Sequence, residues 1–282
     1  MGKLDGKVVF VTGAARGQGR SHAVRLAQEG ADIIAIDLCE PIATMNYPLA
    51  TPEDLAQTVK EVEALDRRIL ASKADVRNRE QLITAVEEGI AALGSLDVVV
   101  ANAGICPGGE TTLLSGFIDA TDVDLIGVMN TVAASVPHLQ PGASVIVTGS
   151  TAGLMKGTTE NIGASGGAGY MFAKQIVFRY VEAVALQLAP HMIRLNGIHP
   201  TNCDTQLLHN VDVYRAFRPD LENPTREEAM VALPNMQAMP IPFIDPIDVS
   251  HLVAFLASDE SRYITGLNIR VDAGAMLKTP PM

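Results

Sequence analysis

The sequence has few cysteines and no spacing typical of a disulfide framework or a metal centre. Its three cysteines, Cys39, Cys106 and Cys203, are odd in number and far apart, which is typical of free thiols in a reducing compartment. The six histidines are scattered, and none falls into an H-E-x-x-H, C-x-x-C or C-x-x-H pattern. Both absences argue against a secreted disulfide-rich protein and against a zinc site.

Basic clusters, long apolar runs and targeting signals are also missing. The formal net charge is −11 and no Lys/Arg stripe offers a contact surface for phosphates, which argues against a nucleic-acid partner. No run approaches the roughly 18 apolar residues of a membrane span. The opening MGKLDGKVVFVTG lacks a cleavable signal, and Gly6 stands where a myristoylation signal has Ser or Thr. We therefore expect a soluble cytoplasmic protein with no nucleic-acid or membrane partner.

Apolar, β-branched runs alternate with helical patterns along the chain. Strands that are apolar throughout and separated by helices indicate a parallel sheet covered on both faces. No internal repeat or break in composition marks a second domain. The sequence predicts an α/β fold with a doubly wound parallel sheet of the Rossmann type, in a single domain over residues 1–282. The predicted strands lie in KVVFVTG, DIIAID, LDVVVANAG, SVIVTGS, MIRLNGIHP and NIRVDAG.

Three long segments exceed what this minimal fold needs, and one of them, residues 151–169, contains GGAG. Residues 38–72 form an insertion with a predicted helix capped at Thr51, because Pro52 and Asp54 follow at the positions that favour a helix start. Residues 205–245 contain five prolines and several methionines. Long ordered loops usually act as lids or binding loops, so we expect roles there in covering the site and in holding substrate. The alternative is that these segments are surface loops without a functional role.

The first strand-to-helix turn has the composition of a phosphate-binding loop. Gly13, Gly17 and Gly19 follow a buried strand in G-x-x-x-G-x-G spacing and allow backbone amides to approach a pyrophosphate. Asp37 ends the next strand, where a carboxylate accepts ribose hydroxyls and repels a 2′-phosphate. These features favour NAD over NADP. Arg16 is a contrary sign, because a basic side chain there could receive that phosphate.

Tyr170 and Lys174 lie four residues apart in GAGYMFAKQ. This spacing places both side chains on one helix face, which serves equally for a shared site or for an ordinary helix surface. Ser150 follows the predicted strand SVIVTG, where a hydroxyl is by itself more often a helix cap. The residues alone leave both interpretations open.

The order of the motifs resolves this choice by resemblance to a family. TGAARGQG (12–19), ADV (74–76), NAG (102–104), Ser150, YMFAK (170–174), IHPTNCDT (198–205) and YITGLNIRVDAG (263–274) resemble, in this order, the motifs of short-chain dehydrogenase/reductases over nearly the whole chain. The resemblance implies the catalytic residues Ser150, Tyr170 and Lys174. It also implies contacts of Asp75 and Val76 with adenine, of the 102–104 segment beneath the nicotinamide, and of Thr201 and Thr205 around the carboxamide and phosphates. The cofactor-binding residues predicted in total are Gly13, Arg16, Gln18, Gly19, Asp37, Leu38, Asp75, Val76, Asn102, Ala103, Gly104, Tyr170, Lys174, Thr201 and Thr205.

The chemistry of an alcohol dehydrogenase fits these three side chains. Oxidation of a secondary alcohol needs a base for the hydroxyl proton, and a phenol with a pKa of about 10 is too weakly ionised at neutral pH. We expect Lys174 to lower the pKa of Tyr170 and to hold the nicotinamide ribose. We expect Ser150 to donate a hydrogen bond to the substrate oxygen.

A closer resemblance is carried by the insertion together with ARGQGRSHA and HPTNCDT. These segments are similar to the mycofactocin-associated branch of the family, which includes carveol dehydrogenase-like proteins. The resemblance implies that the insertion covers the dinucleotide, that NAD exchanges slowly, and that mycofactocin reoxidises its reduced form.

One position departs from the pattern of the family. The helix after the NAG strand usually carries a catalytic asparagine, whereas DVDLIGVMNT has Asp124 there. Asn130 cannot replace it, because six residues along a helix give about 9 Å of rise and a different face. Asp124 could support the protonation of Lys174 or impair the proton relay, and the sequence leaves this open. His199 precedes Pro200 and is expected to be packed rather than to transfer protons.

The expected substrate is a small hydrophobic secondary alcohol or its ketone. We expect the wall of its pocket in Gly153–Met155, in residues 157–169 and in the apolar side chains of the 205–245 segment, and we expect a homotetramer. Two other functions stay open: a carbonyl reductase with exchangeable NADPH, which Arg16 favours, and a non-catalytic NAD-binding regulator, which Asp124 favours. The apolar residues expected in the wall are Leu207, Leu208, Met236, Met239 and Phe243.

Overall fold

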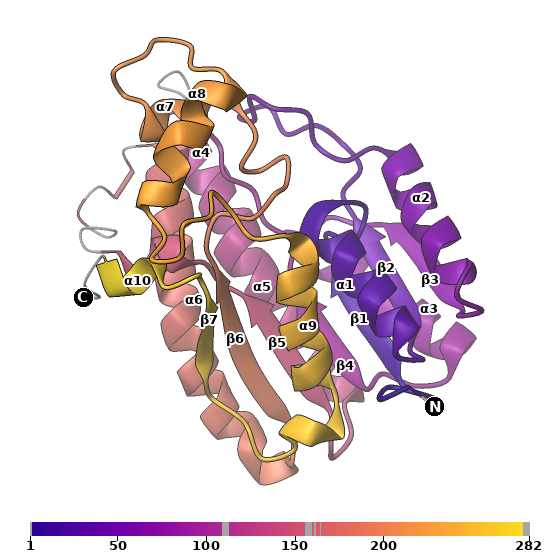
Figure 1. The fold of residues 1–282 in the computed structure, drawn as a ribbon. Helices are drawn as coiled ribbons and strands as arrows, with labels where there is room; N and C mark the ends of the chain where they lie inside the picture. The colour runs from indigo at the N-terminus through magenta and orange to yellow at the C-terminus, as the bar shows by residue number, and fades with distance from the viewer. Residues whose placement is uncertain (1, 109–112, 156–159, 161, 164, 279–282) are drawn as a thin grey trace.

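The computed structural model describes residues 2–108, 113–155, 160, 162–163 and 165–278. These residues form one domain in which a seven-stranded sheet lies between two layers of helices (Figure 1). Every strand pair is parallel, in the spatial order β3-β2-β1-β4-β5-β6-β7. The strands are β1 (Val8–Thr12), β2 (Asp32–Asp37), β3 (Ile69–Lys73), β4 (Val98–Ala101), β5 (Ser144–Thr148), β6 (Arg194–Pro200) and β7 (Asn268–Val271).

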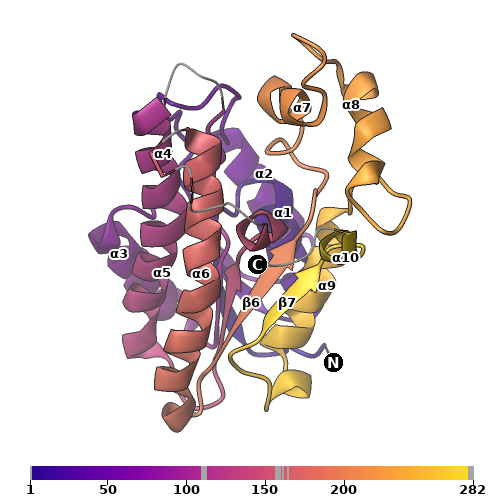
Figure 2. The ribbon, with the colours of Figure 1, turned by 90° about the vertical axis from the view of Figure 1, so that its left-hand side faces the viewer.

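The helices divide between the two faces of the sheet. Figure 2 shows α3, α4, α5 and α6 on one side and α1 and α9 on the other, with α7 and α8 above the sheet. A single turn of π-helix joins α4 to α5. The α-helices are α1 (Gly17–Gln28), α2 (Pro52–Glu63), α3 (Arg79–Leu93), α4 (Leu113–Thr121), α5 (Gly127–Ser135), α6 (Gly166–Leu188), α7 (Val211–Phe217), α8 (Arg226–Ala232), α9 (Pro246–Ala257) and α10 (Ala275–Lys278). The π turn is Asp122–Ile126, and 3₁₀ turns lie at Val136–His138, Thr151–Leu154, Ala189–His191, Leu233–Asn235 and Asp259–Ser261.

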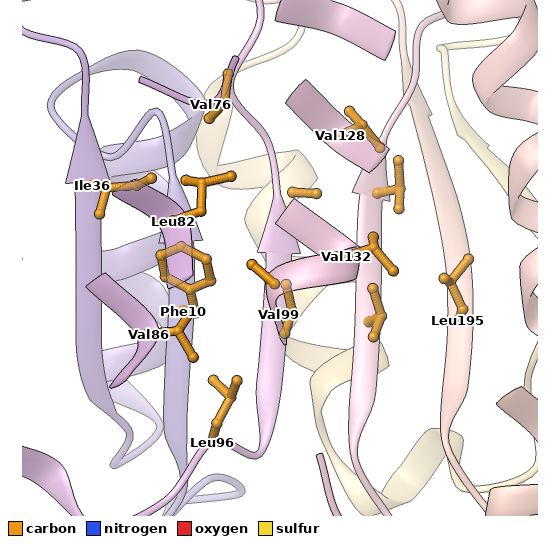
Figure 3. Packing of buried hydrophobic residues seen from close by; sticks show 14 of the residues in the cluster. Phe10, Ile36, Val76, Leu82, Val86, Leu96, Val99, Val128, Val132 and Leu195 are labelled. Atoms are coloured by element: carbon orange, nitrogen blue, oxygen red, sulfur yellow. The ribbon is translucent and has the colours of Figure 1, made fainter. Parts of the chain in front are cut away.

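Two apolar clusters fill the spaces between the sheet and its helix layers. On one side Phe10 packs against Leu82 of α3 and, farther along, Val132 of α5 faces the sheet (Figure 3). On the other side Leu26 of α1 and Val253 of α9 pack on the opposite face. All five residues of β1 are buried, which is why the run VVFVT is apolar almost throughout. Each large side chain removed from water in this way contributes about 1.5–3 kcal/mol to stability.

The sheet changes its winding direction between β1 and β4. From β1 the chain builds outward through β2 to β3, and it then returns to place β4 on the other side of β1. In open parallel sheets of this kind, ligands bind at such a switch point, outside the carboxyl ends of the strands. Gly13 follows β1 and Asn102 follows β4, so both predicted cofactor segments lie at this position.

The six predicted strands and the predicted start of the insertion helix are confirmed. Thr51 caps α2 through a reciprocal capping box with Asp54, and Pro52 is the first helical residue. The strand β3 is an addition, because its half-buried sequence ILASK carries no strong apolar pattern. Within the described residues, no helix is long and apolar enough to cross a membrane.

Candidate active site

A cavity of about 560 Å³ runs along the carboxyl edge of the sheet. The turn after β1 forms one end, and the loops after β4 and β5 together with the start of α6 form the other. The cavity brings together all the predicted cofactor-binding residues, including Gln18, Leu38, Ala103 and Thr201, and the three predicted catalytic residues.

The glycines of the first turn are required by backbone conformation and by close approach. Gly13 and Gly17 have φ values of +67° and +55°, in the region that favours glycine. A Cβ on Gly19 would lie 1.9 Å from the carbonyl oxygen of Gly13, so no larger residue fits there. Thr205 lies beside this turn, because its Cγ2 is 3.3 Å from where a Cβ on Gly17 would lie. The loop after β6 therefore reaches the predicted phosphate position.

This end of the cavity fits an anionic dinucleotide. The side chain of Arg16, at the N-cap of α1, makes no capping hydrogen bond to the first helical amides. Oε1 of Gln18 is buried without a hydrogen-bond partner among the described residues. Free amides at the amino end of a helix and an unpaired polar atom facing a cavity are what a pyrophosphate and its ribose would satisfy.

Asp37 lies at the end of β2, across from the glycine turn. Its Oδ2 accepts a hydrogen bond from the Ala15 amide at 3.0 Å, and its Oδ1 accepts one from the Cys39 amide at 3.2 Å. Burial raises the pKa of this carboxyl, against the opposing effect of these amides. The carboxylate is thus held at the cavity by two fixed donors, in the place predicted for contact with ribose.

The predicted cofactor-binding residues that follow β3 and β4 are fixed in place by contacts within the protein. Asp75 forms a two-pronged ion pair with Arg77, with its Oδ2 2.7 Å from Nη2, and Val76 lines the cavity beside it. Asn102 is fixed by the end of β1, since its amide donates to Thr12 Oγ1 at 3.0 Å and its Nδ2 donates to Thr12 O at 3.1 Å. Gly104 follows it at the far end of the cavity.

Ser150, Tyr170 and Lys174 meet at that far end. The hydroxyls of Ser150 and Tyr170 are hydrogen-bonded to each other. Nζ of Lys174 lies 5.6 Å from the centre of the Tyr170 ring and donates to the Thr148 carbonyl at 2.9 Å. Ser150 also caps the 3₁₀ turn that follows it, accepting from the Ala152 amide at 3.1 Å, so its two interpretations are compatible.

The charge environment of Tyr170 differs from the prediction. Burial, followed by the negative charge of Asp124, raises the pKa of Tyr170 above its ordinary value, and the hydrogen bond with Ser150 offsets part of this. The positive charge of Lys174, which is expected to lower this pKa, is opposed by a negative partner, because its Nζ lies 2.9 Å from Oδ1 of Asp124. The side chains of both partners are almost fully buried, with exposures of 3% and 0%.

Residues 38–51 form a segment that closes part of the cavity, which we call the covering segment. Ile42, Tyr47, Leu49 and Ala50 line the cavity from this side. The hydroxyl oxygen of Tyr47 accepts from the Cys106 amide at 3.4 Å, which brings a second phenol toward the catalytic end. Sequence reasoning missed Tyr47, because nothing in its neighbourhood indicates which side chain of the insertion turns inward.

The covering segment is fastened to the rest of the protein at two further points. Nη2 of Arg16 donates to the Pro48 carbonyl at 2.6 Å, and Oγ1 of Thr44 donates to Asp119 Oδ2 at 2.6 Å. Arg16 is therefore engaged with protein rather than presented to a phosphate group.

The predicted apolar wall is correct in part. Met155, Leu207, Leu208 and Met236 line the cavity, but Met239 and Phe243 do not. Met239 is 60% exposed. Phe243 packs edge-on against the ring of His209, 5.6 Å between ring centres, because the chain has turned away from the cavity there.

Gly153, another residue predicted in the wall, does not line the cavity, and residues that were not predicted line it instead. Gly153 packs against the backbone of α6, where a Cβ would lie 2.5 Å from the carbonyl carbon of Lys174. Val213, Ala216 and Phe217, which the sequence did not single out, line the cavity from α7. Of the predicted 157–169 stretch, Gly167 lines the cavity, and residues 157–159, 161 and 164 lie outside the described residues.

Three other side chains have structural partners. His199 is buried, and its Nε2 is 2.8 Å from Asn268 Oδ1, so it packs behind Ser150 as expected. Asn130 donates to the Val76 carbonyl, away from Lys174. The hydroxyl of Thr201, which lines the cavity, donates to Gln237 Oε1 at 3.3 Å. All three cysteines are free, and among the described residues no three His, Cys, Asp or Glu side chains form a metal-binding group.

Comparisons with known proteins give consistent results. The family model described as Enoyl-(Acyl carrier protein) reductase matches residues 13–276. The chain is 48% identical to a putative short-chain type dehydrogenase/reductase of Mycolicibacterium smegmatis, with 98% of this chain and 99% of that protein covered. It is 44% identical to a (-)-trans-carveol dehydrogenase of Rhodococcus erythropolis, with 99% and 100% covered. The crystal structure of carveol dehydrogenase from Mycobacterium avium in complex with NAD superposes with a TM-score of 0.91 at 46% identity, over 98% and 100% of the two chains.

Proposed function

Because the chain belongs to the short-chain dehydrogenase/reductase family, we propose that it transfers hydride between a small hydrophobic secondary alcohol, such as carveol or another cyclic terpenoid alcohol, and its ketone, with NAD as cofactor. One observation carries this proposal: the paired hydroxyls of Ser150 and Tyr170, beside Lys174, lie in the same cavity as the glycine turn and Asp37. The similarity to carveol dehydrogenases supports the choice of substrate class.

Each side chain has a defined task in the proposed reaction. NAD, when bound, accepts or supplies the hydride. Tyr170 exchanges a proton with the substrate oxygen, and Ser150 orients that oxygen by hydrogen bonding. Lys174 and Asn102 hold the nicotinamide end, whereas Asp37 and the α1 amides hold the ribose and pyrophosphate at the other end. The apolar side chains of Met155, Leu207 and Met236, together with their neighbours, favour a hydrophobic substrate and exclude water.

We further propose that NAD leaves the protein slowly and that mycofactocin reoxidises it in place. The covering segment supports this, because it lines the cavity and is fastened through Arg16, Thr44 and Tyr47. The same contact of Arg16 with Pro48, together with Asp37, argues against the NADPH-dependent carbonyl reductase.

We propose a homotetramer in the cytoplasm. Apolar side chains stand exposed on the outer helices and near the last strand, where a further copy would cover them, and the three free thiols suit a reducing compartment. They include Leu114, Ile118, Leu186, Met192, Tyr263 and Leu267.

The test begins with the protein purified without added nucleotide. Denaturation and mass analysis should release NAD in nearly one copy per chain after extensive dialysis. The holoprotein should then oxidise carveol and other cyclic secondary alcohols with an artificial electron acceptor, and primary alcohols of equal size much more slowly. An empty protein that turns over ketones with added NADPH would establish the carbonyl reductase instead.

A further inference from the structure

Asp124 is a buried carboxylate at the catalytic end of the cavity. It belongs to the π turn between α4 and α5, a helix irregularity that is frequent at functional sites. Its Oδ2 accepts a hydrogen bond from the Ile105 amide at 3.0 Å, and its Oδ1 lies 2.9 Å from Nζ of Lys174. Lys174 donates in addition to the Thr148 carbonyl at 2.9 Å. The ion pair thus joins the π turn to α6, to the segment that follows β4 and to the end of β5.

The contacts of this position match a carboxylate and not an amide. Oδ2 of Asp124 accepts a hydrogen bond from the Ile105 amide, whereas Oδ1 is in ion-pair contact with the Lys174 ammonium and has no regular hydrogen bond among the described residues. An asparagine has one oxygen, and its NH₂ group would face one of these two donors with nothing to accept its hydrogens. Gly104 leaves room for the pair, since a Cβ there would lie 2.6 Å from Oδ1 of Asp124.

The pair changes the charge that acts on Tyr170. Removing one partner of a buried ion pair leaves an uncompensated charge, so the two groups are expected to stay ionised together with zero net charge. Besides Asp124, the groups in the described part of the chain that act most strongly on the charge of Tyr170 are hydroxyls and a thiol. They are Ser150 after β5, Cys106 after β4 and Tyr47 from the covering segment. Burial raises the pKa of Cys106 to about 12, so this thiol adds no charge near neutrality.

We propose that Asp124 is a positioning residue that holds Lys174 by a direct ion pair and thereby opposes the positive charge that Lys174 would otherwise exert on the Tyr170 hydroxyl. This inference rests on the proposed function. In ketone reduction, hydride moves from the reduced nicotinamide to the carbonyl carbon, while the Tyr170 proton moves to the carbonyl oxygen. The resulting phenolate regains a proton from solvent. The reduction rate should therefore fall as the pH rises, and the rate of the alcohol oxidation in the proposed function should increase with pH as Tyr170 ionises.

The pH profiles of Asp124→Asn holoenzyme test this proposal. The substitution removes one negative charge and leaves the Lys174 cation unopposed, which favours the phenolate. The rise of the oxidation rate and the fall of the reduction rate should both move to lower pH than in the wild type. A profile displaced by one pH unit changes the proton-limited rate at a fixed pH about tenfold. Asp122→Asn is the matched control, because it makes the same charge change in the same π turn and should leave both profiles in place.

Profiles that stay in place or move to higher pH in Asp124→Asn would overturn the proposal. An equal displacement in Asp122→Asn would do so as well, because it would reveal only an effect of net charge. Wild-type protein that turns over neither alcohols nor ketones would instead refute the proposed function.

A stability cycle tests the ion pair without any turnover. Asp124→Asn and Lys174→Met should each lower the unfolding temperature, because each leaves a buried group without its partner. The double variant should lose clearly less than the sum of the two losses. Additive losses would contradict the direct pair. If Asp124→Asn alone does not fold, folded protein from the double variant would support the pair, and a double variant that also fails to fold would contradict it.

Discussion

Arg16 links the covering segment to the glycine turn, and its removal tests how NAD is retained. The perturbation is Arg16→Ala, which deletes the 2.6 Å hydrogen bond to the Pro48 carbonyl. The helix start is little affected, because the Arg16 side chain makes no capping bond. Two interpretations of Arg16 make opposite predictions. As a fastening it slows the release of NAD, and as a phosphate receptor it binds NADP.

The size of the effect follows from the exposure of this bond. A hydrogen bond from a charged donor contributes about 1.5–3 kcal/mol when it is well buried, but Arg16 is only half-buried, which reduces the value to about 1 kcal/mol. If the covering segment must open before NAD leaves, this corresponds to about fivefold faster release. Thr44→Ala removes the bond to Asp119 at another fastening point and should add a similar factor when combined with Arg16→Ala.

The assay measures exchange. Protein loaded with isotopically labelled NAD is diluted into a large excess of unlabelled NAD, and retained label is followed over time. Arg179→Ala is the control, because within the described residues this exposed arginine on α6 contacts Glu182 and the ring of Phe178 and not the covering segment. Unchanged NAD release in Arg16→Ala, together with weakened NADP binding, would refute the fastening and favour the NADPH-dependent reductase.

Two other predictions concern the catalytic phenol and a buried histidine. Tyr170→Phe should retain NAD and lower turnover by about 10²-fold or more, and near-normal turnover would exclude Tyr170 as the proton-transfer group. Burial lowers the pKa of His22 from 6.5 to about 3. Between these values the unfolded chain binds a proton that the folded chain does not, so acidification should lower the unfolding free energy by about 1.4 kcal/mol per pH unit. Urea titrations from pH 7 to pH 4 should show this slope reduced in His22→Asn, which keeps a polar group toward Ser250, and kept in His191→Asn at the surface.

The strands were predictable where burial on both faces makes the sequence apolar throughout. The runs VVFVT and SVIVT are buried at every position, and both strands lie where the sequence places them. The strand β3 lies at the edge of the sheet, pairs only with β2, and is half-buried or exposed along its length. Its sequence ILASK therefore carries a weak signal that does not distinguish it from the end of the insertion. An edge strand pairs with one neighbour and is less buried than a central strand, so its sequence shows only a weak apolar pattern.

The candidate site also contains residues that the sequence could place and residues that it could not. Gly13, Gly19 and Asp37 are fixed by local turn geometry and strand ends, so motif and spacing were sufficient to place them. Tyr47 was not predictable, because its position at Cys106 depends on contacts between segments about sixty residues apart. Met239 and Phe243 were wrongly placed in the cavity wall for a related reason. In a segment without a regular period, apolar character does not determine which side chains turn inward.

Asp124 illustrates why a departure from a family pattern needs its partners before it can be interpreted. From the sequence alone the carboxylate could support or impair the proton relay, since neither its distance from Lys174 nor its second acceptor contact is encoded in the local pattern. The fold places Ile105, nineteen residues earlier, and Lys174, fifty residues later, at opposite oxygens of the same carboxylate. With the Ile105 amide bonded to one oxygen and the Lys174 ammonium in ion-pair contact with the other, the aspartate is a charge partner of Lys174 rather than a substitute for an amide. Its effect on the phenol then follows from charge, which is why the pH profile of the Asp124→Asn holoenzyme is the decisive measurement for this position.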